Sequence, residues 1–200
     1  MIAVRGISTG IIGFVLISVA ACSSTPPTPP ADIEITFQHR QPIVLQVAAV
    51  EVVDQYQSTL TSPHVEHLHR LTPASVVRRW AAERIETVGA RGLVTLIISE
   101  AAVLEEPLET AQGFLGLFND EPDLRLAGII RATFDHVDIG PPAASHSVEI
   151  VAQASVEVLE SATLNERDLA YFRVVEKLAE EFDRALTAEV ERSLGYLIVR

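Results

Sequence analysis

Apolar and polar residues alternate most regularly between residues 146 and 158. One side of an extended chain would carry only apolar residues, at Val148, Ile150, Ala152, Ala154, Val156 and Val158. The other side is polar except at Val151. A two-residue period predicts a strand with one face in the core and one in water. Similar patterns predict strands over residues 33–38, 43–53, 92–104 and 124–139.

Residues 72–88 instead repeat apolar positions every three or four residues, which is typical of a helix with one buried face. Thr72 is the expected N-cap, and Pro73 stands at the first helical position. Gly89 follows the last apolar residue, Val88, as a stop signal. The pattern predicts a helix that ends near Val88.

A second helical pattern occupies residues 163–194, and Thr163 and Glu166 form a capping box at its start. The predicted order is therefore ββαβββα. Two helices on one face of a mostly antiparallel sheet make an α+β sandwich of two layers. The second strand, the first helix and the third strand would form a crossover, right-handed if these two strands are parallel.

The N-terminal segment has one positive charge, at Arg5, a short apolar run over residues 11–20, and the residues Val19-Ala-Ala-Cys22. This arrangement resembles the signal peptide and lipobox of bacterial lipoproteins. The resemblance implies cleavage after residue 21 and lipidation of Cys22 by a diacylglyceryl group and an amide-linked acyl chain such as palmitate. The alternatives are plain secretion and an uncleaved transmembrane anchor, which needs about 20 mainly apolar residues.

Residues 1–21 are thus the predicted signal peptide, and residues 22–32 are a lipidated cysteine with a tether. Four prolines in the eight residues after Cys22 favour polyproline II, and at ~3 Å per residue these eight residues would span roughly 25 Å. Residues 33–200 are long enough for a single periplasmic domain. Serine, rather than aspartate, after Cys22 favours the outer membrane over the inner membrane.

The formal net charge of −12 limits the possible partners. An acidic chain is poorly suited to bind nucleic acid or to make broad contact with anionic lipid. We therefore expect membrane contact through the lipid anchor. Cys22 is the only cysteine, so no disulfide is expected in the domain.

The sequence His64-Val-Glu-His-Leu-His69 is the only candidate metal site. Imidazoles beside a carboxylate are suitable ligands for zinc or copper, and His67 and His69 would lie on one side of an extended chain. No second group of ligands accompanies His64, His67 and His69, so a polar connection into the helix is the favoured interpretation. We assign no metal and no cofactor.

Other chemical motifs are missing from the sequence. It contains no Gly-x-Ser-x-Gly elbow, no glycine-rich phosphate loop after a strand, and no EF-hand spacing around Asp120. We therefore expect a protein that is not an enzyme and has no catalytic residues.

An apolar segment lies where the third and fourth strands should be joined. It contains four large apolar residues where polar ones are usual, at Phe114, Leu115, Leu117 and Phe118. The segment either folds back over the core or contacts a partner or a lipid bilayer. We take these four residues as the candidate partner or lipid contact.

The lipobox, the proline-rich tether and the ββαβββα order together resemble small envelope lipoproteins. Two groups are similar: the auxiliary lipoproteins of ABC-type transport systems and the lipopolysaccharide-assembly lipoprotein. Three segments are closest to an uncharacterised proteobacterial lipoprotein family, namely Pro63-His-Val-Glu-His-Leu, Arg78-Arg-Trp-Ala and Ala162-Thr-Leu-Asn-Glu-Arg. None of these groups implies a catalytic motif.

These resemblances imply a lipid-anchored periplasmic binding protein that supports lipid or lipopolysaccharide transport, or envelope maintenance. Its expected partners are an envelope protein, such as a component of a transport complex, and a lipid held between helix and sheet. The alternative is a structural lipoprotein that acts only through protein–protein contact. Metal binding through the three histidines is the third hypothesis.

Overall fold

The computed structural model describes residues 34–109, 120–138, 140 and 143–199. The predicted signal peptide, Cys22 and the tether lie outside the described residues. So does the apolar segment with Phe114, Leu115, Leu117 and Phe118. Their predicted roles stay predictions. In the part of the chain that is described, no helix is long and apolar enough to cross a membrane.

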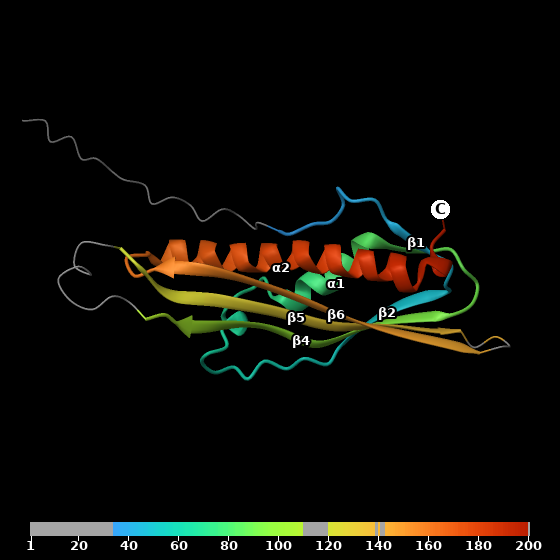
Figure 1. The fold of residues 1–200 in the computed structure, drawn as a ribbon, viewed down its shortest axis with the longest axis horizontal. Helices are drawn as coiled ribbons and strands as arrows, with labels where there is room; N and C mark the ends of the chain where they lie inside the picture. The colour runs from blue at the N-terminus through green and yellow to red at the C-terminus, as the bar shows by residue number, and fades with distance from the viewer. Residues whose placement is uncertain (1–33, 110–119, 139, 141–142, 200) are drawn as a thin grey trace, which may run out of the picture. The chain divides into compact units, whose positions relative to one another are not determined.

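A four-stranded sheet lies below α2 in the view of Figure 1. Its order is β2 (Ala49–Asp54), β4 (Leu93–Pro107), β5 (Pro122–Asp138) and β6 (Ala144–Leu159). The pairs β4–β5 and β5–β6 are antiparallel, while β2 and β4 are parallel. The sheet is thus mostly antiparallel, as predicted, and the chain crosses over from β2 to β4 through a helix.

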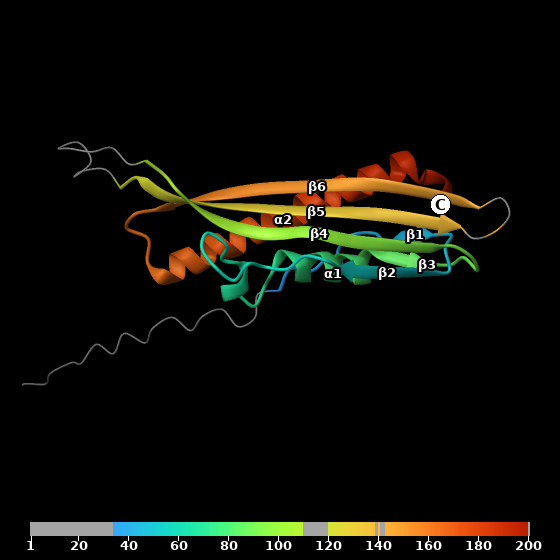
Figure 2. The ribbon, with the colours of Figure 1, turned by 90° about the horizontal axis from the view of Figure 1, so that it is seen from below.

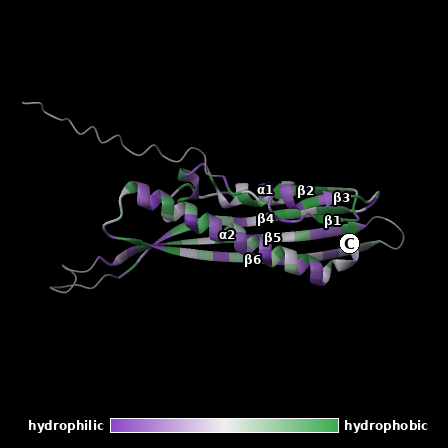
Figure 3. Cartoon of the chain, turned by 90° about the horizontal axis from the view of Figure 1, so that it is seen from above, coloured by the Kyte–Doolittle hydropathy of each residue, from purple (hydrophilic) through white to green (hydrophobic). Residues whose placement is uncertain are grey.

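Two helices, α1 (Pro73–Arg84) and α2 (Leu164–Ser193), lie on the same side of this sheet (Figure 2). Both begin at the predicted threonine caps. Apolar and polar segments alternate along α2 because one of its faces is buried (Figure 3). At Gly128 of β5, an added Cβ would lie 2.5 Å from Leu178 Cδ1, so glycine permits the close approach of α2. The predicted two-layer α+β fold is confirmed.

The predicted strand at residues 33–38 is wrong for its described part. Residues 34–38 form no strand, although Phe37 is buried. The Phe37 N–H donates to the Glu83 carboxylate of α1 instead of to a neighbouring strand. The alternating pattern here therefore belongs to a segment that packs one side chain, Phe37, against α1 and is not part of a sheet.

The predicted strand at residues 43–53 is two strands. β1 (Ile43–Leu45) pairs in parallel with β3 (Ile85–Thr87) as a separate two-stranded sheet, and β2 follows after a bend. The first helix consequently ends at Arg84 rather than near Val88. The Val88 N–H donates to Leu45 O, so the β-branched residues after α1 find backbone partners outside the helix.

Candidate binding sites

Glu66 fixes the connection between β2 and α1 at the end of β4. It begins a short 3₁₀ helix, η1 (Glu66–Leu68), and is 2% exposed. The Tyr56 hydroxyl donates to Glu66 Oε1 over 2.7 Å, and the Val103 N–H donates to Oε2 over 3.2 Å. Burial raises the pKa of Glu66, but the hydrogen bonds from Ser58, Tyr56 and Val103 together hold this pKa below its usual value. The carboxylate is therefore a charged anchor satisfied mainly by neutral donors.

The three candidate metal ligands face different surroundings. His64 Nδ1 lies 3.6 Å from Glu66 Oε1, whereas the His69 ring stacks on Tyr171 of α2 with centroids 3.5 Å apart. His67 Nδ1 is buried and makes no hydrogen bond to any described residue. His67 lies within a 3₁₀ turn, so the extended geometry that would align it with His69 is wrong. Within the described ranges, no three His, Cys, Asp or Glu side chains are grouped as metal ligands.

A cavity of about 480 Å³, which we call the end cavity, lies between η1, the end of the sheet and the first turns of α2. Seven of its twelve lining residues are apolar or aromatic, namely Val65, Leu68, Leu124, Leu126, Val158, Leu164 and Tyr171. His69, Arg70, Glu105, Arg167 and Asp168 complete the lining. Leu68 and Leu164 are 70% and 82% exposed, so the apolar wall continues onto the surface.

The end cavity is positioned by a hydrogen bond between α2 and the segment before α1, and by the His69 stack. The Tyr171 hydroxyl donates to Leu71 O, which ties α2 to the start of α1. Burial lowers the pKa of His69, although Asp168 and Glu105 oppose this. A neutral imidazole at neutral pH therefore covers the aromatic face of Tyr171, and the wall of the cavity gains little charge there.

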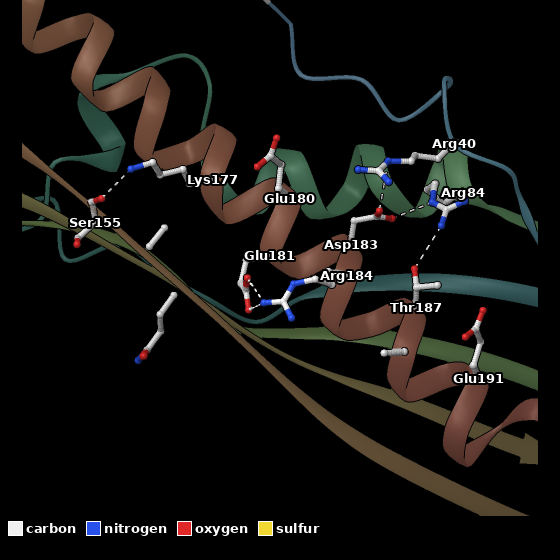
Figure 4. A pocket seen from close by; sticks show the side chains of 13 residues that line it. Arg40, Arg84, Ser155, Lys177, Glu180, Glu181, Asp183, Arg184, Thr187 and Glu191 are labelled. Carbon is white, nitrogen blue, oxygen red and sulfur yellow. Dashed lines mark hydrogen bonds and ion pairs between the residues drawn. The ribbon is translucent and has the colours of Figure 1, made fainter.

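A second hollow, of about 800 Å³, runs over the outer side of α2 from Gln153 on β6 to Arg40 and Arg84 (Figure 4). Beside it lies buried Asp183, which accepts from Trp80 Nε1 at 2.7 Å and from Arg84 Nε at 2.8 Å. Arg84 also donates to the Thr187 hydroxyl. We call this group the Asp183 junction. Its polar groups bind one another, so it holds α1 against α2.

The third candidate surface is the open face of the sheet, which is the face turned away from both helices. Two arginines of β5 each lie between two glutamates. Arg125 is 3.9 Å from Glu106 and 3.3 Å from Glu157. Arg131 is 3.4 Å from Glu100 and 2.9 Å from Glu149. We call these groups the two Glu–Arg–Glu rows.

Uncharged residues fill the space between the two rows. They form two cross-strand sets, Leu104–Ala127–Ser155 and Ala102–Ile129–Gln153. A hollow of about 600 Å³, the open-face hollow, lies over this region. It is lined by Glu100, Leu104, Glu106, Arg125, Ala127, Gly128, Ile129, Gln153, Ala154 and Ser155.

Sequence reasoning considered Glu66 only as the carboxylate beside the histidines, and it missed the anchoring role of Glu66, the position of Tyr171 and the Asp183 junction. Asp183 carries a usable signal, because it follows Phe182 on the apolar side of α2, where a charged residue needs a partner. The Trp80 indole N–H likewise needs an acceptor when buried. No local pattern distinguishes Glu66 from the many exposed glutamates of the chain.

No known protein-family model matches the sequence, and comparison with curated proteins gives no match. One of the solved structures with a similar fold is rare lipoprotein B from Shewanella oneidensis. It has 14% identity and a TM-score of 0.38, and the match covers 74% of this chain and 98% of that chain. A putative lipoprotein from Caulobacter crescentus has 12% identity, a TM-score of 0.42, and coverages of 74% and 90%. An uncharacterised lipoprotein B from Nitrosomonas europaea has 13% identity, a TM-score of 0.42, and coverages of 78% and 93%.

These neighbours are bacterial lipoproteins, which agrees with the resemblance to small envelope lipoproteins that the sequence implies. The similarity concerns the fold, and it does not extend to what this chain binds.

Proposed function

We propose that this protein is a lipid-anchored periplasmic accessory protein that holds an acyl chain in the end cavity. In this proposal it is anchored to the outer membrane through Cys22 and supports lipid or lipopolysaccharide transport or envelope maintenance. The end cavity is the observation that carries the proposal. Sites for small ligands are typically concave and mostly apolar, with a few polar groups that fix the orientation.

The apolar part of the wall supports an acyl chain as the ligand. Leu126 and Val158 are each 4% exposed and form the inner wall, where a methylene gains about 0.8 kcal/mol on leaving water. Leu68 and Leu164 extend this apolar path to the surface. Two arginines, Arg70 and Arg167, line the cavity with Glu105 and Asp168, so charged groups lie beside the apolar part of the wall, where a polar headgroup would be.

The proposal is tested by extracting lipid from the full-length protein purified from membranes in mild detergent. Mass spectrometry then counts non-covalent lipid separately from the Cys22 anchor. In the Val158→Phe variant the larger side chain fills the end cavity, and we expect bound lipid to fall sharply. Val148→Phe is the matched control, because Val148 lies on the same strand and is also buried, but does not line the cavity.

Two results would contradict the proposal. One is wild-type protein without non-covalent lipid. The other is equal lipid content in the Val158→Phe and Val148→Phe variants, which would place the lipid elsewhere.

A structural envelope lipoprotein that acts only through protein–protein contact is the second candidate function. The acidic open face of the sheet favours it. Crosslinking in intact cells, followed by mass spectrometry of proteins and lipids, separates the two functions. One stable protein partner without lipid favours the structural role, whereas a transport component with lipid favours the accessory role.

A further inference from the structure

The open face of the sheet carries an ordered set of charges, and no helix or strand of the described residues packs on it (Figure 2). On β2, β4, β5 and β6, two arginines on this face stand against six carboxylates, those of Glu51, Glu100, Glu106, Asp135, Glu149 and Glu157. The formal charge of this face is therefore −4. Each Glu–Arg–Glu row keeps a charge of −1 after its internal pairing.

The spacing of the two rows defines the length of a ligand. Arg125 and Arg131 are six residues apart on β5, which corresponds to roughly 20 Å along a strand. Between them, the side chains of Ala127 and Ile129 form the centre of the open-face hollow. Val151 is 39% exposed beside Arg131, and it interrupts the polar side of β6 within the two rows.

We propose that the open face is a docking surface for an extended segment of another protein, with apolar side chains between two basic residues. The basic side chains bind the two Glu–Arg–Glu rows, and the apolar side chains enter the open-face hollow. In an extended segment, residues 1, 3, 5 and 7 share a side. Lysine at positions 1 and 7 and leucine at positions 3 and 5 therefore match the two charged rows and the two uncharged sets between them.

The negative charge of the open face favours a basic segment of another protein over a second copy of the same chain. Two copies would bring two faces of charge −4 together, and like charges across an interface are unfavourable. An anionic bilayer is opposed for the same reason. The rows are half-exposed, with Arg125 and Arg131 side chains each 40% exposed, so their carboxylates are accessible to a cationic partner.

The test uses the full chain in a nonionic detergent and a fluorescent peptide, Lys-Thr-Leu-Thr-Leu-Thr-Lys. Fluorescence anisotropy measures binding. We expect saturable binding that weakens with salt, because exposed charges are screened within about 10 Å at 0.1 M ionic strength. Two control peptides should bind weakly or not at all. One has glutamate in place of both lysines, and the other has the same composition with the lysines two positions apart.

Two variants of β6 locate the bound peptide. Gln153→Lys places a cation in the open-face hollow and should weaken binding about tenfold, while Ser147→Lys should change it less than about twofold. Ser147 is an exposed residue of the same strand and face that does not line the hollow. Circular dichroism of both variants verifies that they fold.

Four results would overturn the proposal. The first is absence of saturable binding up to about 1 mM peptide, the range of weak association. The second is equal binding of the lysine and glutamate peptides, and the third is an equal effect of the two variants. The fourth is sedimentation of the wild-type chain as a dimer that Gln153→Lys dissociates, which would identify a second copy as the occupant.

Discussion

Two buried carboxylates lie near opposite parts of α2, and their surroundings differ. Asp183 is bound by the guanidinium of Arg84 and the indole of Trp80, and the neighbouring Phe182 ring packs edge-on against Trp80. Glu66 is bound mainly by a phenol and a backbone amide, and the end cavity lies beyond it. The comparison indicates that the Asp183 junction provides stability, while the Glu66 end leaves room for a ligand.

Removing the charge of Asp183 should have the largest effect. Asp183→Ala leaves buried Arg84 without its counterion, and breaking such a pair costs about 3–5 kcal/mol. Urea unfolding followed by circular dichroism measures the loss. Asp168→Ala, at an exposed position of the same helix, is the control and should change stability by less than about 0.5 kcal/mol. A loss as small as that of the control would mean that the junction adds no stability.

Glu66→Gln should destabilise the protein less, by about 1–3 kcal/mol. The amide replaces one acceptor oxygen by a donor, so either Tyr56 or the Val103 N–H loses its partner. Glu105→Gln is the control, because Glu105 is exposed at the same end of the sheet. If Glu66→Gln cost more than Asp183→Ala in the same urea series, the comparison between the two carboxylates would be reversed.

Enlarging a side chain should cost more stability in the closely packed interior between α2 and the sheet than at the end cavity. Gly128→Ala should cost about 1–3 kcal/mol, because the new Cβ meets Leu178 at 2.5 Å. Gly195→Ala is the control, since nothing lies within 4 Å of its Cβ position. Val158→Phe should be tolerated better than Gly128→Ala despite its larger volume, because the ring can enter the end cavity. Thermal unfolding of the three variants compares them, and equal losses for Gly128→Ala and Gly195→Ala would contradict close packing here.

The smallest expected effect is the pH dependence of stability. Burial lowers the pKa values of His69 and His136, so the unfolded chain binds protons more tightly than the folded chain. The free energy of unfolding should therefore fall as pH drops below about 6.5, by at most about 1.4 kcal/mol per pH unit for each proton. The loss ends below the folded pKa values.

Two single variants show how much each histidine contributes to the pH dependence of the free energy of unfolding. His69→Gln removes the contribution at the end cavity, and His136→Gln removes the contribution of the ring bound to Tyr196. The slope should decrease in each variant. An unchanged slope in both would exclude these histidines as its source.

The sequence predicts the elements whose packing is regular along their length. β6 and α2 follow one period over 16 and 30 residues, so their burial and starting points agree with the pattern. A local pattern does not predict segments whose backbone hydrogen-bond partners come from distant parts of the chain. Residues 85–87 continue a helical pattern, yet β1, more than 40 residues earlier, offers them backbone partners and makes them a strand.

The candidate sites were predictable to a smaller extent. The alternation in β6 indicates a sheet face in water, and Val151 marks its interruption. The Glu–Arg–Glu rows depend on the register between three strands, which no local pattern specifies. The end cavity likewise depends on how the first turns of α2 meet η1. The histidines of this connection are easy to notice in the sequence, but the residue that fixes the connection is Glu66.

β6 is an outer strand of the sheet and runs for 16 residues without a proline. Such edges invite unwanted strand pairing and aggregation, and proteins commonly oppose this with a lysine. Lys177 is the only lysine of the chain, and its ammonium group lies 3.4 Å from the backbone carbonyl of Ser155 in β6 (Figure 4). A flexible, strongly hydrated cation at this position raises the cost of approach for another strand, so one residue of α2 helps to keep neighbouring molecules apart when they are crowded.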